Sequence, residues 1–295
     1  MFVQAISKVS GFTRAIHSIS RNYKGEKIIP GAATLFFVND EGFAITCKHV
    51  VQWLSQGMQM GKHYTAFKEE LNRIPKDGRF KQMLRNLETK YKFEENSPIQ
   101  MKTTFVDCID KISGFTWHLH PDYDLAIIKF NDFNKLLYQG HAVFPKDSNN
   151  INQGKFLCRL GFPFPEFNNF RFNPEKDDIE WTNEGVKASP RFPIDGMLTR
   201  FIGDAKGVKY GIEMSTPGLR GQSGGPLFDE NGIVYGMQSR TKHLHLGFDI
   251  EDKEIITKGK TKKINDYSFI HLGECIHVDV IKAFLTQHQV RFTDV

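Results

Sequence analysis

Short runs of apolar residues, separated by polar turns, make up most of this chain. Residues 31–50, GAATLFFVNDEGFAITCKHV, place two such runs around a turn at 39–42, which is typical of a β-hairpin. Further strand patterns are DLAIIKF, GKFLCRLGFPF, PIDGMLTRFIG, YGIEMST and GIVYGMQSR. Regular short strands with glycine and asparagine turns predict an all-β protein of the barrel or sandwich type.

One segment, residues 61–93, has the periodicity of helices instead. Its apolar residues recur three and four positions apart, and 75–78 (Pro-Lys-Asp-Gly) separates two groups of them. The two groups are Phe67, Leu71 and Ile74, then Phe80, Leu84 and Leu87. We interpret the segment as a solvated helical insertion in preference to a dedicated partner site.

Two later segments also depart from the pattern of short strands. Residues 242–266 are polar and rich in lysine, which indicates a long hairpin or a mobile loop. The sequence VDVIKAFLTQHQ has an apolar helical stripe preceded by Asp279, so it predicts a C-terminal helix with Asp279 as its N-cap.

The composition is that of an ordinary soluble protein. The 295 residues are 40% hydrophobic and 25% charged, with a net charge of +5. No apolar run is long enough to cross a bilayer, and the N-terminal residues lack the features of a signal peptide. We therefore expect a cytoplasmic protein with no membrane association. One basic run, KGKTKK, is too little to favour nucleic acid as a partner.

Neither cysteines nor histidines form a recognisable metal motif. The cysteines contain no C-x-x-C pair and no disulfide-type spacing, which favours a reducing compartment. They are Cys47, Cys108, Cys158 and Cys275. Two His-x-His pairs, at 118/120 and 243/245, have no carboxylate or cysteine at ligand spacing. We expect no metal and no other cofactor.

A single serine among glycines, Ser223 in GLRGQSGGPLFDENG (218–232), is the strongest candidate for chemistry. Glycine allows unusual backbone angles and lets N–H groups approach a ligand closely. The segment is consistent either with a tight turn before a strand or with a nucleophile beside an oxyanion hole. By itself it leaves both open.

A serine nucleophile needs a base and a group that orients the base. His49 ends the apolar run AITCKHVV, and Asp124 directly precedes the apolar strand LAIIKF. Asp122 is a rival for the same role, but Asp124 adjoins the strand directly, so we prefer it. The order His, Asp, Ser along the chain is that of the chymotrypsin type.

Four segments carry a specific resemblance: ITCKHV, DYDLAIIK, RGQSGGPL and LGFP. With them, the chain resembles a trypsin/chymotrypsin-like serine peptidase of the HtrA-like branch, without disulfides and without a PDZ domain. The similarity extends over most of residues 31–285. It implies two six-stranded antiparallel barrels in one peptidase unit. The first barrel would cover about 12–140, including the insertion, and the second about 150–295, including the C-terminal helix.

The resemblance also implies a serine endopeptidase that acts through an acyl-enzyme. His49, Asp124 and Ser223 would be the catalytic triad, and the backbone N–H groups of Gly221 and Ser223 the oxyanion hole. A protein or peptide would be the substrate, and the helical insertion could contact a regulatory protein. Two alternatives stay open: a latent barrel used as a binding or regulatory module, and an enzyme acting on esters.

Specificity is the least defined part of the resemblance. It places Pro217 at the base of the pocket for P1, the residue before the scissile bond, with Gln238, Ser239 and Arg240 on the pocket strand. An acid at position 217 would indicate cleavage after Lys or Arg, and none is there. One hypothesis is an acidic P1, with Arg240 and Lys242 supplying positive charge. The alternative, which we favour, is that both basic side chains point to solvent.

Overall fold

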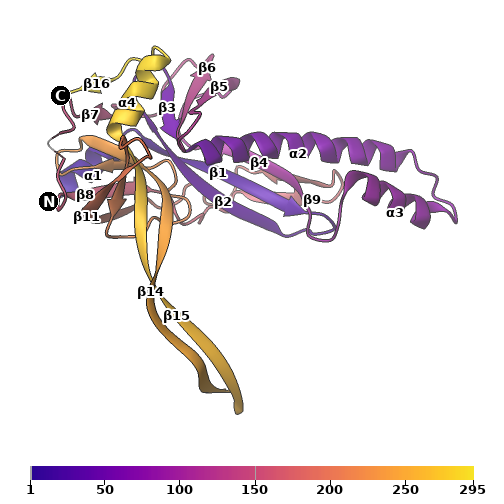
Figure 1. Cartoon of the computed structure of the whole chain (residues 1–295). Coiled ribbons are helices and arrows are strands. Elements are labelled where there is room, and N and C mark those ends of the chain that lie inside the picture. Colours follow the sequence, from indigo (N-terminus) through magenta and orange to yellow (C-terminus); the bar gives the residue numbers. More distant parts are fainter. Residues whose placement is uncertain (1, 150) are drawn as a thin grey trace.

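Two six-stranded sheets form the body of the protein in the computed structural model, which describes residues 2–149 and 151–295 (Figure 1). The first sheet is antiparallel throughout and curled, with strand order β4-β1-β2-β3-β6-β5. Its strands are β1 (Thr13–Asn22), β2 (Ile28–Phe37), β3 (Phe43–Thr46), β4 (Pro98–Phe105), β5 (Gly114–Leu119) and β6 (Ala126–Asn131).

The second sheet is a closed barrel with strand order β11-β12-β15-β14-β13-β8. Its strands are β8 (Phe156–Gly161), β11 (Phe192–Gly203), β12 (Lys209–Met214), β13 (Pro226–Phe228), β14 (Val234–Thr257) and β15 (Lys260–His277). A short parallel pair, β7 (Val143–Phe144) and β16 (Thr293–Asp294), joins the connection between the sheets to the C-terminus. The predicted all-β, two-barrel architecture is confirmed.

One continuous apolar core joins the two halves of the body. It contains Phe36 and Ile127 from the first sheet, Leu157 and Leu227 from the barrel, and Phe284 from the C-terminal helix, each no more than 2% exposed. Helix α1 (Val3–Ser10), which the sequence analysis did not predict, adds Val9 to the same core. A shared, closely packed core of this kind keeps the loops of the two halves at fixed positions relative to one another.

The predicted helical insertion is present, but its first helix begins earlier than expected. Helix α2 is Lys48–Asn72 rather than starting near 61, and α3 is Phe80–Tyr91. Val50, Val51 and Leu54 are buried against the main core, so packing extends the helix toward the N-terminus. The break between the helices coincides with Pro75, which disfavours helical geometry before it.

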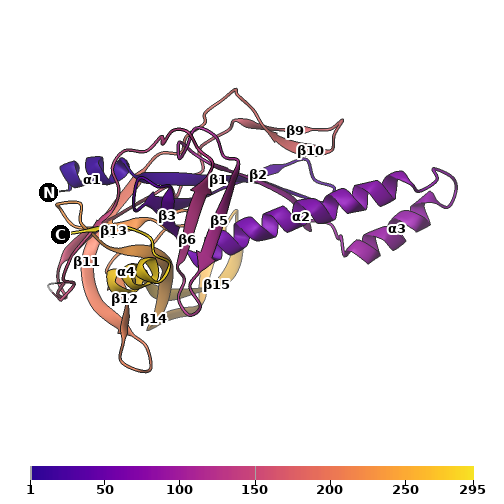
Figure 2. The ribbon, with the colours of Figure 1, turned by 90° about the horizontal axis from the view of Figure 1, so that it is seen from above.

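The outer parts of these helices form an arm that reaches away from the body (Figures 1 and 2). The arm has its own apolar cluster, in which Phe67 is 1% exposed. A hairpin that the sequence analysis missed, β9 (Phe170–Asn173) with β10 (Asp178–Trp181), lies near the arm in both views. The insertion therefore packs apolar surface of its own and is not simply a solvated helix pair.

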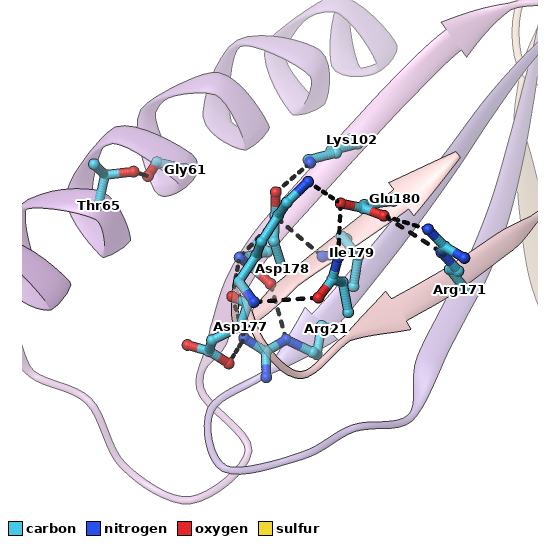
Figure 3. Close-up of polar contacts among 12 residues, drawn as sticks. Arg21, Gly61, Thr65, Lys102, Arg171, Asp177, Asp178, Ile179 and Glu180 are labelled. Carbon is cyan, nitrogen blue, oxygen red and sulfur yellow. Dashed lines mark hydrogen bonds and ion pairs between the residues drawn. The ribbon is translucent and has the colours of Figure 1, made fainter. Parts of the chain in front are cut away.

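Charged groups attach the β9–β10 hairpin to the first sheet (Figure 3). The side chain of Arg21, on β1, is 3% exposed and donates to Asp177 Oδ1 at 2.7 Å and to Gln100 Oε1 at 2.8 Å. Lys102, on β4, donates to Asp178 Oδ2 at 2.6 Å. Arg21, a buried cation that is paired and hydrogen-bonded, and the half-buried Lys102 together fix the hairpin at one position.

The lysine-rich segment 242–266 is a hairpin, formed where β14 and β15 extend far beyond the barrel (Figure 1). The C-terminal helix α4 (Val278–Gln287) is also present, but its N-cap is His277 and not Asp279. The His277 ring accepts from Asp279 N at 3.2 Å, and Asp279 is the second residue of the helix. Within residues 2–149 and 151–295, no helix has the length and apolar character that a bilayer crossing requires.

Candidate active site

His49 lies in the first turn of α2, three residues after β3 ends. The strand-to-helix transition occurs at Cys47, whose backbone is extended (φ −74°, ψ 146°). The Cys47 side chain is fully buried, and its Sγ donates to the Gln238 carbonyl of the barrel at 3.2 Å. The transition thereby holds the His49 backbone, while the imidazole itself remains 51% exposed and accessible to a ligand.

Asp124 accepts two hydrogen bonds from His49. Backbone N of His49 lies 2.9 Å from Oδ1, and Nδ1 lies 2.8 Å from Oδ2. Because a carboxylate only accepts, Nδ1 carries the proton and Nε2 is left as the basic nitrogen. In the described part of the chain, Asp122 makes no side-chain bond to His49, so the geometry favours Asp124 over its rival.

Ser239 is the second side chain that binds Asp124. Its Oγ donates to Asp124 Oδ2 at 2.6 Å. Burial by itself would raise the pKa of Asp124, but the hydrogen bonds from His49 and Ser239 outweigh burial and lower that pKa to about 2. The carboxylate is therefore ionised at neutral pH and can stabilise a protonated imidazole. Sequence reasoning placed Ser239 in the substrate pocket alone and missed this contact.

Two glycines give the Ser223 turn its shape. Gly221 and Gly224 have φ values of +90° and +89°, which favour glycine. A Cβ on Gly224 would lie 2.0 Å from the carbonyl oxygen of Thr34 on β2. The same strand donates from Thr34 N to the Ser223 carbonyl at 3.0 Å. The turn is thus pressed against the first sheet, which brings Ser223 toward the residues that this sheet carries.

The Ser223 hydroxyl donates to the backbone carbonyl of Ser239 at 3.4 Å. Within the described residues, no hydrogen bond joins it to His49. Ser239 therefore links the two groups: its carbonyl contacts Ser223 and its hydroxyl contacts Asp124. In the same part of the structure, the backbone N–H groups of Gly221 and Ser223 donate to no protein acceptor. Such free donors can bind an oxyanion.

A pocket of about 520 Å³ adjoins Ser223. All four residues predicted to bind substrate line it: Pro217, Gln238, Ser239 and Arg240. The Arg240 side chain is 66% exposed and forms an ion pair with Glu274, which is 8% exposed. The charge of Arg240 is therefore engaged outside the pocket, whose described lining does not include Glu274.

Sequence reasoning also missed Arg159, a fully buried arginine on β8. Its Nη1 donates to Gln238 Oε1 at 2.7 Å, and its Nη2 donates to the Thr216 carbonyl at 3.0 Å. Burial lowers the pKa of the Arg159 guanidinium. A signal was present in the sequence, because an arginine interrupts the otherwise apolar strand FLCRLG.

One group in the described residues has the spacing of metal ligands: Cys47, His49 and Asp124, whose donor atoms lie within 4.8 Å of one another. Burial raises the pKa of the Cys47 thiol, so it stays protonated and is a poor ligand. The two His-x-His pairs are used otherwise: His118 stacks on His288, and His243 contacts His271 on the neighbouring strand. The residues do not fit a resident metal well.

The structure thus brings His49, Asp124, Ser239 and Ser223 together in one site between the two β-sheets. A family model described as a trypsin-like peptidase domain matches residues 33–237, which is more than half of the chain. The chain therefore belongs to the trypsin-like peptidase family.

Solved structures of the HtrA-type protease AlgW are similar to this chain. One, a serine-to-alanine form with a decapeptide, has 12% identity and a TM-score of 0.48 over 98% of this chain and 68% of that one. The same form with a tripeptide has 12% identity and a TM-score of 0.47 over 97% and 62%. AlgW itself with a tripeptide has 13% identity and a TM-score of 0.47 over 98% and 65%. No curated protein matches the chain.

Proposed function

We propose that this protein is a serine endopeptidase in which Ser223 attacks the scissile carbonyl. The observation that carries the proposal is the connection from His49 to Asp124, and through Ser239 to Ser223, beside two free backbone donors. An exposed histidine held by an ionised carboxylate next to a serine is the combination that activates a hydroxyl.

Each group has one task in the proposed reaction. His49 Nε2 takes the proton of Ser223 Oγ as the Oγ–carbon bond forms, and Asp124 stabilises the resulting imidazolium. The N–H groups of Gly221 and Ser223 donate to the oxyanion. His49 then protonates the leaving amine, the amide bond breaks, and water hydrolyses the acyl-enzyme by the same steps.

A second candidate is a latent barrel that binds peptides without cleaving them. The observation that favours it is the orientation of the Ser223 hydroxyl toward the Ser239 carbonyl and not toward His49. Hydrogen bonds in unliganded sites are often long before a substrate binds, so we rank latency second.

Labelling with a fluorophosphonate probe tests the proposal. We expect wild type to be labelled, and Ser223→Ala and His49→Ala to lose the label. Asp122→Asn is the matched control, because Asp122 lies two positions from Asp124 and makes no bond to His49; it should be labelled like wild type. Absence of label from folded wild type would favour the latent barrel.

A further inference from the structure

Arg159 is the one arginine of the described barrel strands that is fully buried yet has no carboxylate within 4.0 Å. Its hydrogen bonds all go to neutral groups, those of Gln238 and Thr216. Its buried Nε has no partner within the described part of the chain. A buried cation without a counter-charge is unfavourable, so its retention here needs a reason.

The position of Arg159 links it to the pocket beside Ser223. Gln238, which accepts from Arg159 Nη1, lines that pocket. On the other side, a Cβ on Gly273 would lie 2.1 Å from Nη1, so the space at this glycine is filled by the guanidinium. Arg159 therefore lies directly behind the pocket wall, separated from it by one amide side chain.

Arg159 also sets the direction of the Gln238 amide. Because Oε1 accepts from Arg159, the NH₂ group is directed away from it, and Nε2 is 2.2 Å from where a Cβ on Gly218 would be. Gly218 is part of the pocket wall. The NH₂ group donates to the backbone carbonyls of Arg240 at 2.9 Å and Glu274 at 3.4 Å, so the amide is held at both ends, and the charge of Arg159 stands behind it.

The residues that line the pocket are also basic. It includes Arg220, Arg240, His243 and His271, and none of its described residues is acidic. The two imidazoles contact each other through their Nδ1 atoms at 2.5 Å, so one donates and the other accepts. The described lining of this pocket of about 520 Å³ therefore contains no carboxylate, and Arg220 is its arginine without an ion pair among the described residues, since Arg240 pairs with Glu274 outside it.

We propose that the pocket accepts an acidic P1 side chain, glutamate or aspartate, with Arg159 as the specificity-determining charge. The inference rests on the proposed function, since it names the substrate of the same site. A substrate carboxylate would supply the missing counter-charge across Gln238, where a low dielectric strengthens the attraction. Arg159 is in this account a positioning residue and does not touch the reacting atoms.

The test compares fluorogenic peptides that differ only at P1. We expect kcat/KM for Glu to exceed that for Gln, and Asp that for Asn, by at least about tenfold, as for other charge pairs shielded from water. Glu and Gln have the same shape, so the ratio measures charge alone. Equal rates, or faster cleavage after Lys, Arg or aromatic residues, would overturn the inference.

Two variants test whether Arg159 is the charge that selects the P1 residue. Gln238→Glu places a carboxylate where the amide oxygen now meets Arg159, so it should remove most of the preference for Glu over Gln in kcat/KM. Arg159→Met should do the same by removing the cation. Arg171→Met, which removes an exposed arginine of the β9–β10 hairpin, is the control and should leave the ratio unchanged. A ratio that persists in Gln238→Glu would contradict the proposal.

A binding measurement separates this inference from the proposed function. In Ser223→Ala, peptides ending in Glu should bind at least about tenfold more tightly than the same peptides ending in Gln, by calorimetry. If peptides ending in Glu bind more tightly but wild type is neither labelled by the probe nor able to cleave peptides, the proposed peptidase activity is refuted and the pocket assignment stands. A labelled, active wild type with no acidic preference would refute the pocket assignment and keep the peptidase. Neither activity nor preference would refute both.

Discussion

The chain buries two arginines in two different ways, one on β1 beside the β9–β10 hairpin and one behind the candidate cleft. Arg21, on β1, is 3% exposed, pairs with Asp177, and stacks on Phe172 with its guanidinium carbon 4.6 Å from the ring centroid. Arg159 is fully buried, pairs with neutral groups, and leaves its Nε without a partner in the described residues.

The difference indicates what each region is for. Beside the β9–β10 hairpin, the charge of Arg21 is matched by Asp177, so this network stabilises the attachment of the hairpin to the first sheet. Behind the cleft, one charge is left unmatched next to a pocket. Unsatisfied buried groups are uncommon in folded proteins and often mark function.

Two aspartates, Asp177 beside Arg21 and Asp124 beside His49, allow the sharpest test. Asp124→Asn should lower kcat by about 10⁴-fold, because an amide selects the wrong imidazole tautomer and cannot stabilise the imidazolium. Asp177→Asn should leave kcat within about threefold of wild type. Steady-state hydrolysis of one peptide by both variants measures the difference. A large loss of rate in Asp177→Asn would show that the β9–β10 hairpin takes part in catalysis.

The free energy of unfolding, unlike kcat, should depend strongly on Asp177. Asp177→Ala leaves Arg21 buried and unpaired, so we expect a loss of about 3 kcal/mol in the free energy of unfolding, the low end for a buried pair since Asp177 is 39% exposed. Urea denaturation measures it, with Asp77→Ala, which breaks an exposed pair with Arg79, as the control that should cost under about 1 kcal/mol. Equal losses would mean that Arg21 is solvated.

The Asp124 network should also appear in the pH dependence of stability. The pKa of Asp124 is lowered from 3.8 to about 2. The ionised carboxylate therefore stabilises the fold fully above the unfolded-state pKa, and this stabilisation is lost as pH falls through the folded-state pKa. We expect the stability difference between wild type and Asp124→Asn to shrink by about 2 kcal/mol between about pH 5 and about pH 2. A constant difference in urea titrations would contradict the lowered pKa.

The smallest effects should come from removing one hydroxyl in each network. Tyr64→Phe removes the hydrogen bond from Tyr64 to Asp177, and Ser239→Ala removes the one to Asp124. Each should cost about 1 kcal/mol of stability. Only Ser239→Ala should also lower kcat, because its partner orients His49. If Tyr64→Phe lowered kcat as much, the two networks would be coupled through α2.

Local sequence signals predicted much of the fold. The hairpin of β2 and β3, the strands β6, β8, β11, β12 and β14, and the break at Pro75 all follow from turn residues and apolar periodicity. These act over a few positions, so a sequence shows them directly. The strands β1, β4, β5, β9 and β10 were missed, because their mixed polar and apolar residues gain strand structure only from neighbours in the sheet.

Some residues of the candidate site could likewise be found from local sequence patterns, and others only from the structure. His49, Asp124 and Ser223 were singled out because each adjoins a recognisable local pattern, and their roles remain predictions for the experiments above. The sequence by itself determined which residue types are available for chemistry. Only the tertiary structure decided that Ser239 holds Asp124 and that Arg159 lies uncompensated behind the pocket, because burial and hydrogen-bond partners depend on residues that are distant along the chain.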